Sequence, residues 1–221
     1  MATVLALETS ADACSVALLR SGEMVERHEN LPRSHTQHIL PMVDALLQSA
    51  NMTLAQIDVI AFGRGPGSFT GLRVCASVVQ GLAFAANIPC APVSSLQALA
   101  MTAISTGLSR GHSSILCCVD ARMSEVYGAQ FSVQEGYPAL QGEEFLCAPE
   151  TVSWDSGAAC RVGSGWRYAA EMQYQGEIND ADLLPRAAAV ALLGEQMYKS
   201  GHVVAAARAV PVYLRDDVAW R

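Results

Sequence analysis

The sequence predicts an α/β protein made of two similar lobes. An apolar strand that ends in an acid, a loop, a second strand, a turn and a third strand occur in this order twice, from Thr3 and again from Ile115. The second series follows a polar, glycine-bearing stretch without periodicity, residues 106–114, which is typical of a domain boundary. The repeat lies in the order of the elements and not in residue identity.

The first lobe is expected over residues 1–106. Short apolar or alternating runs bounded by turn residues predict a three-stranded meander, followed by helices that alternate with strands. The first helix should begin at an S-x-x-Q capping box, Ser34 to Gln37, and Pro41 should bend its first turns or end a looser leading turn. The expected strands and helices lie at residues 3–8, 14–20, 24–29, 34–49, 58–62, 70–86, 89–93 and 95–105.

The second lobe is expected over residues 107–206 and carries fewer signals. Pro185 should start a helix that Gly201 ends. Residues 210–214 predict a terminal strand or an extended tail, and the tail 207–221 is expected to pack back on the first lobe. The other predicted segments are strands at 115–120 and 125–133, a further extended stretch, and loop-rich regions at 137–154 and 166–182.

Two lobes of this kind are typical of one known architecture. A meander that continues into helix–strand alternation, present twice, fits the duplicated ribonuclease-H-like fold of the actin-like ATPase superfamily, which includes sugar kinases, actin and Hsp70. The alternative is a single irregular α/β domain. In the duplicated fold, the loop after the first strand of each lobe is where a nucleotide phosphate would lie.

The first of these loops follows Glu8. Actin-like ATPases use an acid near a metal and small hydroxyl or glycine residues under the phosphates. Thr9, Ser10 and Asp12 are residues of this kind at that place. A plain turn is the simpler interpretation of so short a match. We therefore expect Thr9, Ser10 and Asp12 to be a vestigial phosphate loop.

The second loop follows Asp120. Here Arg122 and Glu125 replace the glycines that a phosphate needs in order to approach backbone amides closely. The tripeptide 163–165, Gly-Ser-Gly, could form a phosphate or adenosine turn, although a plain turn is the simpler interpretation. No clear adenosine-binding glycine run follows. We expect no bound cofactor and no catalytic residue.

The glycine loop of residues 63–71 is the strongest local signal, because it follows a strand and opens a helix. Backbone amides and a helix N-terminus at such a place can bind an anion. The dinucleotide fingerprint fails because Ser68 stands where a third glycine is required, and Pro66 breaks the G-x-S-x-G nucleophile elbow. The alternative is a tight turn that lets helix and strand pack closely, which these residues favour.

No metal site is expected. His35 and His38 are three residues apart at a helix start and could share one metal, but two ligands do not make a site and no third ligand stands nearby. Capping and solvated histidines are the simpler interpretation. The residue types for a Ser-His-Asp hydrolase exist, but no spacing supports one.

The helix over residues 70–86 has no clean polar face, which predicts burial on more than one side. Ser77, Gly81 and Ala85 recur every fourth residue and form a stripe of small residues along which another helix can approach. Either the helix of residues 34–49 covers this stripe, or both helices build a subunit interface. The expected partner interface consists of His35, Ile39, Met42, Val74, Ser77, Val78, Gly81 and Ala85.

Composition excludes several classes of function. Hydrophobic residues make up 51% of the 221 and charged residues 16%, so a packed core is expected and disorder is not. The net charge is -7, and Lys199 is the single lysine, which excludes a P-loop lysine. Because phosphate contacts supply most of the affinity for nucleic acid, the chain should not bind nucleic acid tightly by itself.

Cysteine usage and the N-terminus predict a cytoplasmic protein without a membrane partner. The first residues contain no basic segment, and no window approaches the roughly 18–20 uninterrupted apolar residues of a membrane span. The seven cysteines are odd in number and contain no C-x-x-C. Small buried hydrophobes are therefore favoured over a disulfide framework or a zinc ribbon.

Several segments, taken together, resemble the TsaB (YeaZ) family. They are VLALETS at the start, RSHTQHILP, GRGPGSFTGLRV, PVSSLQALA, DARMSEVYGA and the closing PVYLR, and they follow one another in the family's order over nearly the whole chain. GPGSFTGLR followed by SSLQALA and DAR-x-x-EVY is highly specific. The departures are Met123 and Ser124 within the DAR segment, and a chain that stops soon after PVYLR.

The resemblance implies a role in tRNA modification. Members are bacterial, have the duplicated actin-like fold and are paralogues of TsaD, the catalytic subunit that adds threonylcarbamoyl to the tRNA adenosine adjacent (3′) to the anticodon. TsaD carries an H-x-x-x-H metal pair, which is absent from this sequence. The resemblance therefore implies a non-catalytic scaffold that binds and stabilises TsaD, is joined by the ATPase TsaE, dimerises with itself when alone, and meets tRNA only through the complex.

An enzyme of another class is the alternative. The chain could be an independent actin-like ATPase or kinase, or a metallopeptidase of the glycoprotease type, a label that the family has carried. The missing metal pair, the missing adenosine run and the apolar helix favour the scaffold.

Overall fold

The computed structural model describes residues 1–31, 34–154 and 157–215, and this part of the chain forms two compact units. The first unit combines residues 1–98 with 185–211, and the second combines residues 99–184 with the chain from residue 212. The sequence predicts the second lobe at residues 107–206. The chain instead returns to the first unit at Pro185 and leaves it again after Pro211.

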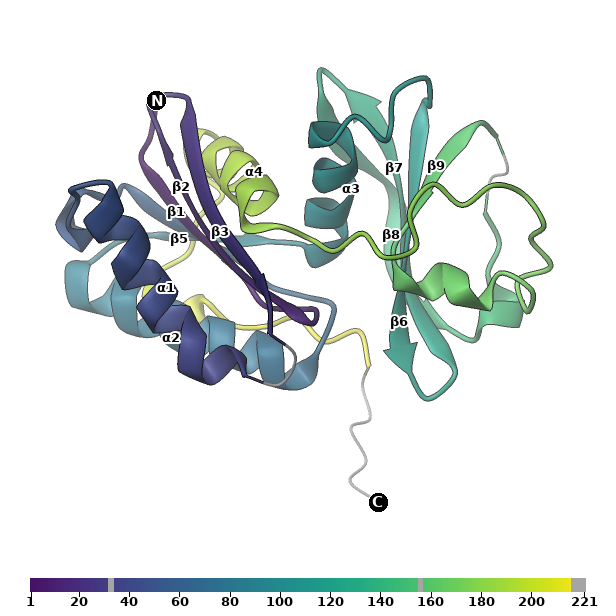
Figure 1. Ribbon diagram of the computed structural model, residues 1–221, viewed down its shortest axis with the longest axis horizontal. Coiled ribbons are helices and arrows are strands. Elements are labelled where there is room, and N and C mark those ends of the chain that lie inside the picture. The colour runs from purple at the N-terminus through teal and green to yellow at the C-terminus, as the bar shows by residue number, and fades with distance from the viewer. Residues whose placement is uncertain (32–33, 155–156, 216–221) are drawn as a thin grey trace. The chain divides into compact units, whose positions relative to one another are not determined.

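A five-stranded mixed sheet forms the centre of the first unit (Figure 1). The three strands of the meander are antiparallel, and the two that follow the helices are parallel to the first strand. In spatial order the strands are β3 (Glu23–Asn30), β2 (Ala13–Arg20), β1 (Val4–Glu8), β4 (Val59–Gly63) and β5 (Cys90–Val93).

Two helices cover one face of this sheet and a third covers the other (Figure 1). Helices α1 (His35–Ser49) and α2 (Phe69–Ala86) share one apolar core with the sheet, to which Leu5, Ile39 and Phe62 belong. Helix α4 (Ala187–Lys199) packs on the opposite face. Helix α3 (Ser95–Ser105) begins in the first unit directly after β5 and continues into the second.

A row of alanines explains why α4 belongs to the first unit. Ala17, Ala6, Ala61 and Ala91 are paired across four neighbouring strands. Such small side chains let a helix approach the sheet closely, and a Cβ on Gly194 of α4 would overlap the Cβ of Ala61. Gly194 therefore lets α4 pack directly on the alanine row of the sheet.

The N-terminus of α4 is held by the meander. Glu26 of β3 accepts a hydrogen bond of 2.9 Å from the backbone N–H of Ala188 and forms a 2.6 Å ion pair with Arg186. A carboxylate at this end of a helix is favourable because the first N–H groups have no partner within the helix. Ser15 Oγ accepts a further bond from Ala187 N at 3.0 Å.

The second unit repeats the arrangement of the first. Its four-stranded sheet also has an antiparallel meander, followed by a strand parallel to the first one. A parallel bridge from Val162 to Asp180 lies where the fifth strand of the first sheet would be. The spatial order is β8 (Tyr137–Cys147), β7 (Glu125–Gln134), β6 (Ser114–Arg122) and β9 (Ala159–Val162). The duplicated ribonuclease-H-like fold predicted from the sequence is confirmed.

The first helix runs from His35 through Pro41 to Ser49, as expected. Some local predictions were wrong. Ser34 stands at the N-cap of α1 but its side chain does not cap the helix, because its hydroxyl donates to the carbonyl of Leu31 at 3.1 Å. Much of the region expected to be loop-rich, residues 137–154, is the long strand β8. The described residues 210–214 contain no strand, which leaves the tail of the two alternatives predicted for them. Short 3₁₀ turns occupy Leu54–Gln56, Pro149–Thr151, Ser164–Tyr168 and Ala206–Arg208.

Helix α2 has the length and mean hydropathy of a membrane span. Six of its residues nevertheless pack into the unit's own fold, on the face turned to the sheet. They are Gly71, Leu72, Cys75, Ala76, Val79 and Ala83. The helix is thus one layer of the first unit, and its apolar outer side is what remains to be explained.

Candidate functional site

The loop after β1 is closed by the glycine loop. Thr9 is fully buried, and its hydroxyl donates a 2.8 Å hydrogen bond to the carbonyl of Gly71. The backbone N–H of Ser68 donates a 2.7 Å hydrogen bond to the carbonyl of Ser10. Asp12 is exposed and lies apart from these bonds. The expected vestigial phosphate loop is thus packed against protein backbone at Thr9 and Ser10.

Three glycines spaced four apart make this close packing possible. A Cβ on Gly63 would overlap the carboxylate of Glu8, and one on Gly71 would overlap the carbonyl of Thr9. A Cβ on Gly67 would lie 2.5 Å from the carbonyl of Ser10. Of the two interpretations of the glycine loop, close packing is the one that these contacts support, because carbonyl oxygens meet the loop where an anion would have to bind.

Glu8 is a buried acid at the end of β1. Its side chain is 1% exposed and accepts hydrogen bonds from Ser10 N and from Ser95 Oγ, the latter at 3.1 Å. Burial raises the pKa of this carboxyl above its ordinary value, and the bonds from Ser10 and Ser95 only partly oppose the shift. Burial thus shifts Glu8 toward its neutral form, which suits a structural carboxyl better than a metal ligand.

The second unit has an acid at the matching place. The Asp120 carboxylate forms ion pairs with Arg167 at 3.1 Å and Arg122 at 3.5 Å. Ser164 Oγ accepts a bond from Asp120 N at 3.1 Å, and the flanking Gly163 and Gly165 lie against the backbone of Cys118. The tripeptide 163–165 is therefore a packing turn, and two guanidinium groups already neutralise the acid. No motif or spacing in the sequence had pointed to Arg167.

The two histidines of α1 do not point at a common centre. The Nε2 atom of His35 lies 3.3 Å from the carbonyl of Ala13, and Nδ1 of His38 lies 2.9 Å from the carbonyl of Ser34. Each ring is thus engaged with a different backbone group. In the described part of the chain, no group of three or more His, Cys, Asp or Glu side chains could hold a metal ion.

An arginine of the closing PVYLR segment anchors the first hairpin of the second unit. Arg215 forms a 2.6 Å ion pair with Glu125 and donates to the carbonyl of Ala121 at 3.2 Å. The turn residues Arg122, Met123 and Ser124 all have left-handed backbone, with φ of 64°, 55° and 57°. Residues 207–211 of the tail belong to the first unit, as expected, with Ala209 in its core, whereas the chain from residue 212 belongs to the second unit.

The residues expected at a partner interface fall into two groups. His35, Ile39 and Met42 of α1 are buried in the first unit, so their placement at an exposed interface was wrong. On α2, Val74 and Val78 are half-buried, whereas Ser77, Gly81 and Ala85 are exposed. The α2 stripe, Ser77, Gly81 and Ala85, therefore faces outward.

A large aromatic side chain lies beside the stripe. Phe84 is 84% exposed, and a Cβ on the neighbouring Gly81 would meet nothing within 4 Å. On α1, Leu40 is also exposed. Sequence reasoning missed Phe84 because an apolar helix without a polar face does not reveal which residues the sheet covers.

The chain is similar to known proteins in both sequence and structure. A protein-family model described as TsaD, tRNA N6-adenosine threonylcarbamoyltransferase, matches residues 29–221. The chain is 40% identical to the tRNA threonylcarbamoyladenosine biosynthesis protein TsaB of Haemophilus influenzae, over 99% of this chain and 96% of that protein. The TsaB protein of Escherichia coli is 38% identical, with the same coverage. The solved structure of YeaZ from Pseudomonas aeruginosa superposes with a TM-score of 0.89 at 42% identity, covering 97% of this chain and all of that one.

Proposed function

The chain belongs to the TsaB (YeaZ) family, and we propose that it is the non-catalytic subunit that binds and stabilises TsaD in the threonylcarbamoylation of tRNA. The modified position is the adenosine adjacent (3′) to the anticodon. In this proposal the catalytic groups all come from TsaD. The outward-facing α2 stripe is the observation that carries it.

The stripe has the properties of a helix-docking surface. Ser77, Gly81 and Ala85 leave the α2 backbone open along one line, and Phe84 beside them exposes an aromatic ring. A second helix can approach a line of small residues closely, and an aromatic ring at its edge can bury a large apolar area. Exposed apolar patches of this kind mark interaction sites in soluble proteins.

A paralogue is the partner that best fits this surface. The match of the TsaD family model to residues 29–221, a range that contains α1 and α2, supports a partner built from similar helices. A surface built from the same two helices can pair with its paralogue or with a second copy through a two-fold arrangement. We therefore propose a heterodimer with TsaD, and a homodimer when the chain is alone.

The strand-end acids support a non-catalytic role. Glu8 is buried, which raises the pKa of its carboxyl, while Asp120 is paired with Arg122 and Arg167. Thr9 and Ser10, which would lie under a phosphate in an actin-like ATPase, are bonded to the glycine loop. None of these contacts favours the alternative of an independent ATPase, kinase or metallopeptidase.

The other partners follow from charge and from the family. With a net charge of -7 and one lysine, the chain contributes little to binding tRNA phosphates, so tRNA should be bound by the complex. We propose that TsaE joins the same assembly, and that the protein acts in the cytoplasm without a membrane partner.

Reconstitution tests the proposal. Purified chain and TsaD are mixed, complex formation is followed by sedimentation velocity, and threonylcarbamoylation of tRNA is measured with and without the chain. We expect a 1:1 complex and modification that depends on the chain. Full activity of TsaD alone, together with no complex, would contradict the scaffold role.

A further inference from the structure

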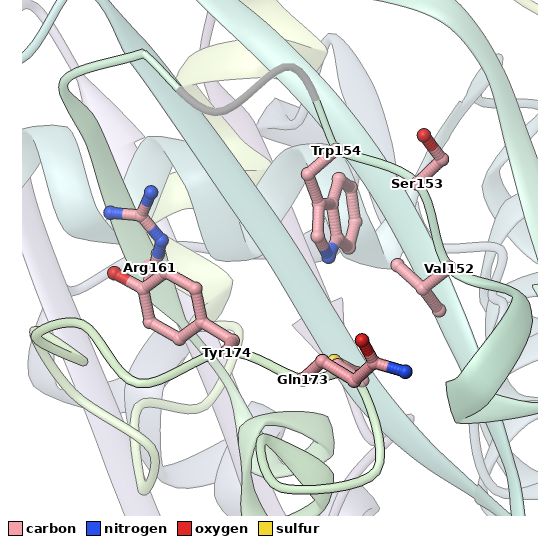
Figure 2. A pocket seen from close by; sticks show the side chains of 7 residues that line it. Val152, Ser153, Trp154, Arg161, Gln173 and Tyr174 are labelled. Atoms are coloured by element: carbon pink, nitrogen blue, oxygen red, sulfur yellow. The ribbon is translucent and has the colours of Figure 1, made fainter.

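The second unit contains a pocket away from both strand-end loops. It lies between the segment that follows β8 and the segment that follows the 164–168 turn, and its volume is about 250 Å³. Figure 2 shows the indole of Trp154, the guanidinium of Arg161 and the ring of Tyr174 around it. Val152 and Met172 add apolar walls. The volume lies below the usual range for drug-sized ligands, so an occupant would have to be small.

Two hydrogen-bond donors of this pocket have no partner among the described residues. They are Nε1 of Trp154 and Nε of Arg161, and both atoms are buried. A buried N–H without an acceptor costs about 1–3 kcal/mol, so an unpaired donor in a native structure calls for an explanation. Both atoms belong to side chains that line the same pocket, so an acceptor bound in this pocket is the partner that the site calls for.

The charge of the pocket is positive. The Arg161 guanidinium donates from one NH group to the carbonyl of Ala159 at 2.8 Å and lies over the Tyr174 ring, 4.4 Å from its centroid. It forms no ion pair with any carboxylate that the structure describes. A ligand with one negative charge would match this single cation and its unpaired donor. A carboxylate is such a ligand, because its oxygens carry the charge and only accept hydrogen bonds.

The aromatic framework holds these donors in place. Trp154 stacks on Trp166 with ring centroids 5.8 Å apart, and Trp166 meets the edge of Tyr174 at 5.4 Å. Trp166 is itself fixed by a 3.3 Å bond from its Nε1 to the carbonyl of Leu116 on β6. Because both walls of the pocket are attached to a buried ring, the site is largely pre-formed, which lowers the entropic cost of binding.

We propose that this pocket binds a small monocarboxylate with an apolar body. The carboxylate would accept hydrogen bonds from Trp154 and Arg161, and the apolar part would lie against Val152 and Met172. The site lies within the second unit and does not include α2, so it is independent of the proposed binding of TsaD.

Titration with simple carboxylates tests the inference. Phenylacetate and isovalerate are added to ¹⁵N-labelled full-length protein, and the indole N–H resonances are followed by NMR. We expect the Trp154 resonance, assigned by its loss in Trp154→Phe, to shift saturably with a dissociation constant of about 1 mM or tighter for at least one probe. Phenylacetamide, which is neutral, should bind about tenfold more weakly than phenylacetate.

Variants locate the site. Trp154→Phe keeps a ring but removes the donor, and Arg161→Gln removes the charge; each should weaken binding about fivefold or more. Because Trp154→Phe lacks the Trp154 indole resonance, its binding is followed through the indole N–H of Trp166, which stacks on residue 154. Arg20→Gln, which removes an exposed arginine of the first unit, is the matched control and should bind as the wild type does. The unchanged resonances of each variant report folding; if Arg161→Gln fails to fold, Trp154→Phe decides.

Three results would overturn the inference. The first is the absence of a saturable shift with either carboxylate up to about 20 mM, well above the expected dissociation constant. The second is equal affinity for phenylacetate and phenylacetamide. The third is unchanged affinity in the folded variants, which would place the binding elsewhere.

Discussion

The hydroxyl of Ser95, the first residue of α3, donates a 3.1 Å hydrogen bond to Oε2 of the buried Glu8 at the end of β1. The bond joins two segments that are 87 residues apart in the chain. In an actin-like ATPase, the acid at this place works beside a metal. Here the carboxyl joins the loop after β1 to the start of α3, and we propose a structural role for it.

Replacing Glu8 by Gln should stabilise the protein at neutral pH. Because the folded-state pKa of Glu8 is raised above 4.5, the folded state keeps a proton that the unfolded state loses. The free energy of unfolding therefore falls as pH rises from the unfolded pKa toward the folded pKa, by about 1.4 kcal/mol for each pH unit between those two values. Glu8→Gln removes this loss while keeping the size of the side chain.

Urea unfolding of wild type and Glu8→Gln between pH 5 and pH 8 measures the effect. The variant's advantage should grow with pH until Glu8 is ionised in the folded protein. If Glu8→Gln is instead less stable at pH 8 than at pH 5 relative to wild type, the carboxyl is charged and stabilising, and a catalytic or metal-binding role would have to be reconsidered.

Two glycine-to-alanine changes in α2 should act in opposite directions. Gly71→Ala puts a methyl group onto the carbonyl of Thr9 and should cost about 1–3 kcal/mol of unfolding free energy through overpacking. Gly81→Ala meets open space within a helix and should gain about 0.5–1 kcal/mol. Thermal and urea unfolding of both variants check this. Equal effects would mean that the glycine loop is not tightly packed on Thr9.

Removing Arg215 should loosen the β6–β7 hairpin. Its ion pair with Glu125 is partly shielded, with side chains 19% and 32% exposed, and Arg215 also binds the carbonyl of Ala121. Arg215→Ala should raise hydrogen exchange in the 121–125 turn. In a double-mutant cycle with Glu125→Gln, the coupling should be about 0.5–1 kcal/mol, near the upper end for exposed pairs. Exchange that is unchanged in the turn would contradict the anchoring role.

Alone, the protein should neither hydrolyse ATP nor cleave peptides above background. The packed loop of Thr9 and Ser10 and the paired Asp120 leave no arrangement in the described residues that would position a metal-bound phosphate. Steady-state assays with Mg²⁺ and ATP check this. Tight magnesium-dependent binding with turnover that is lost in Asp12→Ala would contradict the scaffold role.

The duplicated fold was predictable because its signal is the order of elements. Strand, acid, loop, strand, turn and strand leave clear patterns at residues 3–29 and 115–133. The position of α4 was not predictable in this way, since the partner of its Gly194 is an alanine row that forms only when four strands are in register. Sequence order alone assigned that helix to the wrong lobe.

The candidate site was only partly predictable. A stripe of small residues every fourth position pointed to Ser77, Gly81 and Ala85, and the structure places all three at the surface. Ile39 and Met42 were predicted at the interface, but helical spacing does not distinguish interface residues from core residues. In the structure both lie in the core. Arg167 and Arg215 were missed because ion pairs to Asp120 and Glu125 join residues far apart in the chain.

The central claim is that the α2 stripe binds TsaD. The most direct test is to measure TsaD binding by the Gly81→Arg variant. Gly81 and Gly157 are both exposed glycines with open space around the missing Cβ, so Gly157→Arg in the second unit is the matched control. Both variants should fold like wild type by circular dichroism. Burying an unpaired charge against a partner helix costs several kcal/mol, so Gly81→Arg should lose both TsaD binding and self-association, while Gly157→Arg keeps them. A folded Gly81→Arg protein that binds TsaD as the wild type does would contradict the account.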